Sequence, residues 1–124
     1  MQLGIRKGKT SFQTIDSIVL ERLDGTEVVI TEAIRGAYDE KPYTPKYTAW
    51  RYKAALYLVK DRLAVQVQDT EYRSNIVKKK SISETTVTER YFLSNDNGES
   101  WTEEEAIALE DEQPLSEIFS DSIR

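Results

Sequence analysis

The chain has 124 residues, a formal net charge of −5 and neither histidine nor cysteine. These absences exclude disulfides, zinc sites of the ordinary type, and catalytic centres built from Ser-His-Asp or Cys-His. Its five glycines form no phosphate-binding loop, and no apolar stretch reaches the length of a membrane span. We therefore expect one domain, residues 1–124, that is cytoplasmic and not an enzyme, with no cofactor and no metal.

The N-terminal part predicts a flexible start followed by a β-hairpin. Residues 1–10 contain three basic side chains without an apolar run behind them, so we expect a flexible segment and not a signal peptide. The hairpin is predicted from Asp24-Gly25, a pair typical of a two-residue type I′ turn. Closing the turn there places Arg22 opposite Glu27, a favourable cross-strand charge pair.

A tyrosine-rich segment follows, and it is the first candidate site. Residues 34–45 contain a glycine and two prolines that predict a long loop, and residues 47–59 return to an alternation that favours a strand over a helix. In the Arg35–Lys53 region, cations could hold a nucleotide-like anion while tyrosine rings stack on a base. The alternative is that these tyrosines edge the core and the cations line a solvated face. The candidate ligand-binding residues are Tyr43, Tyr47, Arg51 and Lys53.

Two further strands lead towards the C-terminal part. Residues 63–72 alternate cleanly and predict a strand with one solvated side, and residues 85–93 predict another. Between them, residues 74–84 are polar and include three lysines at positions 78–80. Such a run on a loop is either a phosphate-contact patch or simply solvated, and we do not expect direct binding of nucleic acid.

The most specific string in the sequence runs from Ser94 to Trp101 and fits the pattern Ser-x-Asp-x-Gly-x-(Ser or Thr)-Trp. In it, Asp96 can accept hydrogen bonds from backbone N–H groups of the turn, and Gly98 can adopt a positive φ at no cost. The string resembles the Asp-box, or BNR, hairpin loop of sialidase-like β-propeller proteins. In that family the loop recurs blade after blade, away from the catalytic site, whereas here it occurs once. The resemblance therefore implies a structural hairpin and carries over no activity.

The C-terminal part predicts two short helices. Thr102 and Glu105 form a capping box, the sequence signature of a helix N-terminus. Ile107 and Leu109 follow as the residues that would pack inward. Pro114 suits the first turn of a second helix.

The predicted fold class is α+β: an antiparallel sheet of about five or six strands, followed by the two short C-terminal helices. Residues 11–101 are β-rich in this prediction, and residues 102–124 are acidic and helical. Charge divides the chain in nearly the same place. Residues 1–95 carry 16 Lys or Arg against 12 Asp or Glu, a net charge of +4, whereas residues 96–124 carry Arg124 alone against ten acids, a net charge of −9.

Size, charge and missing chemistry favour a small non-catalytic intracellular binding protein. Ordinary surfaces intersperse both signs of charge, so the excess of acids indicates a site for a protein with a basic surface, although a solvated helix face explains it equally well. The concrete form is an acidic inhibitor of another macromolecule, of the type made by phages against host defence or as immunity partners of toxins. The alternative is a module that sequesters a nucleotide or similar anion through the Arg35–Lys53 region. The candidate partner-binding residues are Glu104, Glu110, Asp111 and Glu112.

Overall fold

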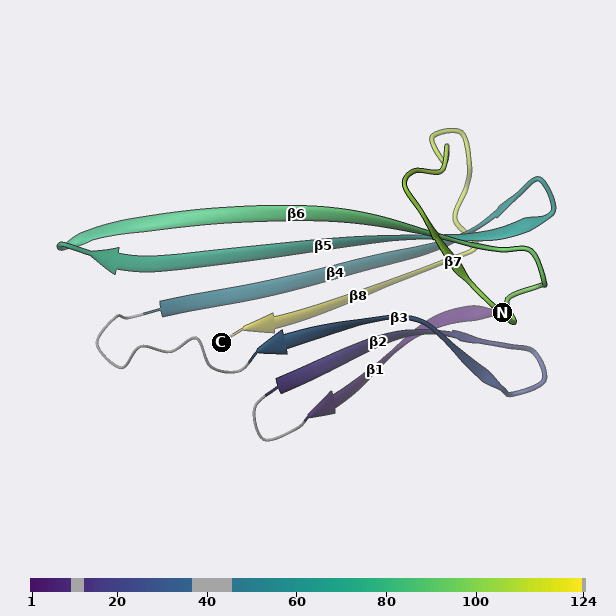
Figure 1. Ribbon diagram of the computed structural model, residues 1–124, viewed down its shortest axis with the longest axis horizontal. Coiled ribbons are helices and arrows are strands. Elements are labelled where there is room, and N and C mark those ends of the chain that lie inside the picture. Colours follow the sequence, from purple (N-terminus) through teal and green to yellow (C-terminus); the bar gives the residue numbers. More distant parts are fainter. Residues whose placement is uncertain (10–12, 37–45, 124) are drawn as a thin grey trace.

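Alternating side chains build eight strands, which form two antiparallel sheets in the computed structural model of the protein (Figure 1). The structure describes residues 1–9, 13–36 and 46–123. The smaller sheet has the strand order β1-β2-β3, and the larger sheet has the order β7-β6-β5-β4-β8. The strands are β1 (Gln2–Lys9), β2 (Gln13–Glu21), β3 (Glu27–Gly36), β4 (Lys46–Val59), β5 (Arg62–Val77), β6 (Lys80–Ser94), β7 (Thr102–Glu104) and β8 (Ser116–Ile123).

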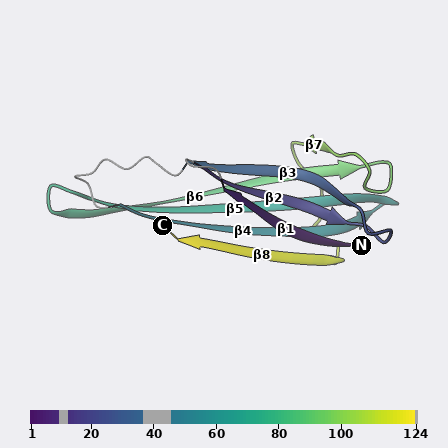
Figure 2. The same ribbon diagram turned by 90° about the horizontal axis from the view of Figure 1, so that it is seen from below.

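The two sheets pack face to face and share one apolar core (Figures 1 and 2). Successive side chains of a strand point to opposite faces, so every second residue enters this core. At one edge β1 approaches β8, and the Leu3 N–H donates a hydrogen bond of 3.2 Å to the Ser116 hydroxyl. The buried core residues are Leu3, Ile18, Leu20 and Ile30 from the smaller sheet, and Ala54, Leu56, Leu63, Val65, Val67 and Phe92 from the larger.

The expected α+β fold is wrong, because no described residue is helical and the two predicted C-terminal helices are absent. Thr102 begins β7, which pairs with Tyr91–Leu93 of β6, and Pro114 precedes β8, which pairs along β4. Short helices in this segment would have few apolar residues to bury, and isolated helices below about 12–15 residues are marginal in water. The edges of β4 and β6 instead offer both segments a row of backbone hydrogen-bonding groups.

The turn between β2 and β3 is longer than the predicted two-residue turn. The Arg22 N–H donates to the Thr26 carbonyl at 2.9 Å, which leaves a three-residue loop from Leu23 to Gly25. Within this loop only Gly25 has a positive φ, +85°, whereas a type I′ turn requires one at both central residues. Asp24 stabilises the observed loop by accepting hydrogen bonds from the Thr26 N–H and hydroxyl at 3.0 and 2.6 Å.

The three-residue loop changes which charges face each other across the hairpin. Glu21, and not Arg22, lies opposite Glu27. Arg6 of β1 pairs with both carboxylates, and its Nη2 lies 2.6 Å from the Glu21 Oε1. Residues 2–9, within the segment that we expected to be flexible, therefore form a strand whose side chains offset the repulsion between two acids of the neighbouring hairpin.

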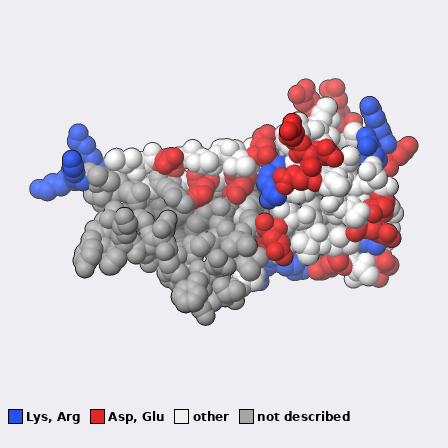
Figure 3. Space-filling model, viewed as in Figure 1, with Lys and Arg blue, Asp and Glu red and all other residues white. Residues whose placement is uncertain are grey.

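β5 and β6 form a long hairpin that extends beyond the smaller sheet (Figures 1 and 2). They pair along residues 63–77 and 80–94, so most of the polar segment 74–84 is strand, and only the lysine run lies at a turn. The turn at the tip consists of Lys78 and Lys79, both with positive φ, as a two-residue type I′ turn requires. The run of lysines therefore projects from one end of the molecule, where Figure 3 shows basic side chains.

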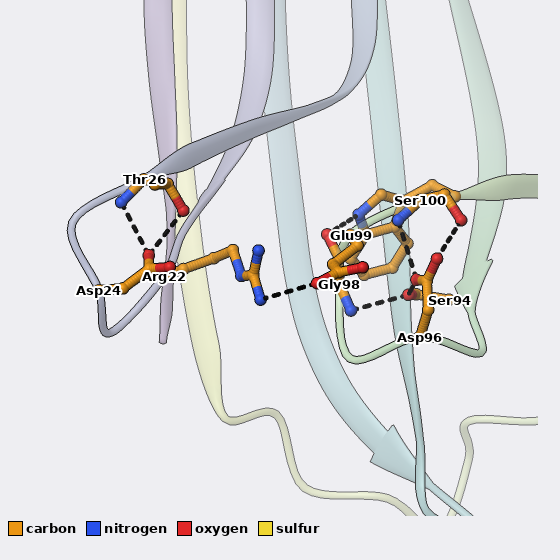
Figure 4. A network of polar contacts seen from close by, with 9 residues as sticks. Arg22, Asp24, Thr26, Ser94, Asp96, Gly98, Glu99 and Ser100 are labelled. Carbon is orange, nitrogen blue, oxygen red and sulfur yellow. Dashed lines mark hydrogen bonds and ion pairs between the residues drawn. The ribbon is translucent and has the colours of Figure 1, made fainter.

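The loop between β6 and β7 is closed by hydrogen bonds around Asp96 (Figure 4). Its carboxylate accepts hydrogen bonds from the Ser100 N–H at 2.9 Å, from the Ser100 hydroxyl, and from the Ser94 hydroxyl at 2.8 Å. The Ser94 oxygen in turn accepts one from the Gly98 N–H at 2.8 Å. These bonds, those from Ser100 above all, lower the pKa of Asp96 from its usual 3.8 to about 2.

The same loop joins the two sheets. Gly98 is buried with φ +91°, and a Cβ at its position would collide with the Leu20 Cδ2 of β2. Glu99 forms an ion pair of 3.6 Å with Arg22, beside the β2–β3 turn (Figure 4). Trp101 packs against the shared core, and its Nε1–H donates to the Gly98 carbonyl at 3.1 Å. These contacts fix the point at which β7 begins.

Replacing Asp96 with Asn should lower the melting temperature at neutral pH, because an uncharged side chain accepts the hydrogen bonds of the loop more weakly. A carboxylate with a lowered pKa stabilises the fold above its unfolded pKa, near 3.8, and loses that contribution as the pH falls towards its folded pKa of about 2. The deficit of the variant should therefore shrink across this window. Thermal unfolding of both proteins at a series of pH values is the measurement.

Asp111→Asn is the matched control for this series, since it removes an exposed carboxylate on a turn. Its melting temperature should follow that of the wild type at every pH. If the deficit of Asp96→Asn stays constant as the pH falls, the charge of this carboxylate does not hold the loop.

Candidate acidic interaction surface

Residues 105–115 form a loop that covers part of the outer face of the larger sheet (Figure 1). Two apolar side chains fasten it: Leu109, which is 8% exposed, and Ile107, which is partly buried. Both face the sheet, as we expected, but they do so from a loop and not from a helix. They pack against side chains of β4, β5 and β6 that point away from the shared core, namely Ala55, Tyr57, Val59, Ala64, Tyr91 and Leu93.

Backbone hydrogen bonds hold the loop at both ends. Where β8 is about to begin, the Leu115 N–H donates to the Leu56 carbonyl of β4 at 2.6 Å. A turn inside the loop is closed by the Glu112 N–H, which donates to the Leu109 carbonyl at 3.0 Å. At the other end β7 is paired with β6. The backbone of this acidic segment is therefore anchored although it has no regular structure.

All four predicted partner-binding residues are exposed: Glu104, Glu110, Asp111 and Glu112. Glu104 ends β7 opposite Tyr91, on the same outer face that the loop covers. The other three follow Leu109 directly and form the turn of the loop. Together with the exposed Glu105 they lie at one end of the molecule, where Figure 3 shows acidic side chains gathered over β7 and the loop. We call these five residues the acidic surface.

Two neighbouring acids contribute to the fold instead. Glu103 binds Arg90, whose Nη2 lies 2.5 Å from the Glu103 Oε1, and hydrogen bonding from Arg90 lowers the pKa of Glu103. The Arg90 guanidinium also lies 5.0 Å from the centroid of the Phe92 ring. Glu99 forms the ion pair across to the smaller sheet. No ion pair to the five carboxylates of the acidic surface is formed by the residues that the structure describes.

Of the four alternative ligand-binding residues, the structure describes the side chains of two. Tyr43 lies outside the described residues, and Tyr47 belongs to β4 with a side chain that is also outside them. Arg51 and Lys53 are exposed and, two residues apart on β4, share its outer face. The Lys53 Nζ lies 5.7 Å from the ring centroid of Phe119, an exposed residue of β8. Binding of an anion at this face stays a prediction.

We did not predict from the sequence the polar residues that lie between the sheets. Asp16 is 4% exposed and lies on the face of β2 that carries Ile18 and Leu20 into the core. The alternation of β2 could have indicated this position, because it places Asp16 on the inward face with Ile18 and Leu20. Acids are rare at such positions. Arg90 reaches from β6 to the Thr31 hydroxyl of β3, a hydrogen bond of 3.0 Å that depends on how the sheets pack.

Comparisons with known proteins assign no family to the chain. No family model, curated protein or solved structure matches it, so the resemblance to the Asp-box loop remains a prediction. Within residues 1–9, 13–36 and 46–123, no helix is long and apolar enough to cross a membrane. The same residues contain no group of three or more His, Cys, Asp or Glu side chains placed to hold a metal ion.

Leu109→Ala should destabilise the protein by about 2 kcal/mol, near the lower end of the range for a buried leucine. It should also loosen the acidic loop, which would then be cut faster by a protease specific for glutamate. Urea unfolding and limited proteolysis are the measurements. Leu115→Ala is the control, because Leu115 is 60% exposed. If both variants unfold and are cleaved alike, Leu109 does not fasten the loop.

Proposed function

We propose that the protein is a non-catalytic binding protein that acts on another macromolecule through the acidic surface. The observation that carries this proposal is the set of five exposed carboxylates on an anchored segment, residues 104–112, which itself contains no Lys or Arg. Residues 99–123 contain nine acids and no Lys or Arg. Most protein surfaces mix the two signs of charge, and a one-signed region produces a field that attracts a partner of opposite charge.

The way the loop is attached supports a role in binding. A surface whose backbone is already fixed loses less conformational freedom on association than a flexible segment does. Here Leu109 and the strand pairing of β7 supply that order without using the carboxylates. Exposed charges contribute little to folding stability, so this cluster of acids has no evident role in holding the fold.

The partner that fits this surface is a protein with a basic patch. Such a patch commonly binds a polyanion, and an acidic protein that covers it blocks that binding. Inhibition of a basic macromolecule is therefore the concrete form of the proposed function. Electrostatic complementarity of this kind acts chiefly on the rate of association and on the choice of partner.

The test uses a triple variant, Glu104→Gln with Asp111→Asn and Glu112→Gln. Its melting temperature should stay close to that of the wild type, because all three residues are exposed. Its association with a co-purified partner should slow by about tenfold at low salt. Association of the wild type should also slow as salt rises, since charges are screened over about 10 Å at 0.1 M ionic strength.

A second triple variant provides the matched control, with the same change in charge at exposed acids outside the acidic surface: Glu32→Gln, Glu84→Gln and Glu89→Gln. It should associate at nearly the wild-type rate. Equal association rates for all three proteins, without dependence on salt, would refute the proposal. A loss of equal size in both triple variants would mean that net charge, and not this surface, attracts the partner.

A further inference from the structure

β6 leaves part of one edge of the larger sheet unpaired. β7 pairs with β6 only along Tyr91–Leu93, and no described strand pairs with the outer edge of residues 80–90. The side chains of residues 80–89 are exposed, and they belong to the hairpin that extends beyond the smaller sheet (Figures 1 and 2). A free edge of this length offers a row of backbone donors and acceptors with which another strand can pair.

The turn at the tip of the hairpin shows which backbone groups point to the free edge. Val77 and Lys80 flank the two-residue turn and lie opposite each other, and in such a turn the flanking residues bond across the hairpin. Successive residues of a strand alternate in this respect, and the pairing of β5 with β6 runs on without a shift. The backbone groups of the even-numbered residues from Lys80 onwards therefore bond to β5, whereas those of Ser81 and Ser83 point outward.

The free edge begins with a segment that is complementary to itself. Residues 80–84 read Lys-Ser-Ile-Ser-Glu. If a second copy runs antiparallel with its Ile82 opposite Ile82, then Lys80 of each copy faces Glu84 of the other, and Ser81 faces Ser83. Opposite charges and apolar side chains in such positions stabilise a strand pair. The serines supply the outward backbone groups, and Ile82, which is 54% exposed, gains an apolar neighbour.

Sterics and charge favour this register over its neighbours. With a two-fold axis at Ile82, the tip of the second copy ends opposite Thr85 and Thr86, before β7 begins to occupy the edge at Tyr91. An axis three or more residues further along would bring that tip against β7. An axis one residue further sets Ile82 opposite Glu84, and an axis two residues further sets two carboxylates opposite each other, which is destabilising.

We propose that the protein forms a two-fold dimer in which residues 80–84 of two copies pair as antiparallel strands and join the larger sheets. Lys79 of one copy then lies opposite Thr85 of the other, so the two basic tips are roughly 20 Å apart and their repulsion is largely screened in physiological salt. The acidic surface lies at the other end of the molecule and stays free in both copies (Figure 3). A contact of this small size makes a reversible dimer.

Sedimentation velocity over a wide range of protein concentrations measures the dimer directly. The wild type should shift from monomer to dimer as the concentration rises. Ser83→Pro removes an outward N–H donor at an edge position where a sheet tolerates proline, so this variant should stay folded and monomeric. Val87→Pro is the matched control, because it changes another outward position of the same edge outside the pairing. A wild type that is monomeric at every concentration, or proline variants that dimerise to the same extent, would overturn the proposal.

Charge reversal tests the register. Lys80→Glu and Glu84→Lys each set like charges opposite each other at both ends of the pairing, so each should weaken association by about tenfold. Glu84→Lys also reduces the net negative charge, so an effect of net charge alone would strengthen association in that variant. The double variant, and an equimolar mixture of the two single variants, restore both charge pairs and should dimerise as the wild type does. Failure of both to recover would overturn the proposal.

Cross-linking locates the two-fold axis. The chain has no cysteine, so a single introduced cysteine reports on one position. Ile82→Cys lies opposite itself where the copies exchange no backbone hydrogen bonds and side chains are closest, so mild oxidation should link two copies. Val87→Cys is the control, because Val87 is also 54% exposed but lies outside the pairing. Cross-linking of both variants at the same rate would overturn the proposal.

Discussion

The contact between Gly98 and Leu20 is the constraint on which the position of the acidic end depends. A loop from the larger sheet reaches the buried side chain of β2 only because Gly98 has no Cβ and adopts a positive φ. Hydrogen bonds centred on Asp96 hold the loop in this shape, and Trp101 closes it against the core. β7 starts directly after Trp101 and leads into the anchored segment that carries the exposed acids. The acidic surface is thus placed by a neutral contact and not by its own charges.

Charge has two separate roles in this molecule. Arg6, Arg22 and Arg90 form ion pairs at places where strands or loops meet. Arg6 pairs with two carboxylates, and Arg22 and Arg90 with one each. These pairs satisfy acids that the packing brings together, although exposed pairs of this kind add little stability one by one. The acidic surface and Asp16 are among the acids that form no ion pair with the described residues. The carboxylates of the acidic surface are exposed, whereas Asp16 is buried between the two sheets.

Local sequence patterns predicted the strands better than the C-terminal segment. The strands predicted from alternation, residues 47–59 and 63–72, lie within β4 and β5. Alternation with period two is a property of a single strand, so it can be recognised without knowing the strand's neighbours. The helix predicted from the capping box of Thr102 and Glu105 is absent. A local pattern does not show that β6 offers an edge with which this segment can pair. The second helix expected after Pro114 is absent for the same reason, because residues 116–123 form β8 and pair along β4.

The same limit applies to the candidate site. An excess of acids in the last quarter of the chain is visible in the composition, and the acids between residues 96 and 117 are exposed in the structure. The partners of Arg90 come from β3 and β7, which are far from it in the sequence. The space around Asp16 likewise exists only between two packed sheets. Such features depend on the docking of the sheets, which no period or motif encodes.

The most direct test of the constraint at Gly98 compares the free energies of unfolding of Gly98→Ala and Gly25→Ala. Both glycines have a positive φ, +91° and +85°, so the backbone strain caused by alanine is similar. A Cβ at Gly25 has nothing within 4 Å, whereas at Gly98 it meets Leu20. We expect Gly98→Ala to lose about 1–3 kcal/mol more than Gly25→Ala, the usual cost of overpacking a core. Equal losses would contradict the claim that this contact positions the loop.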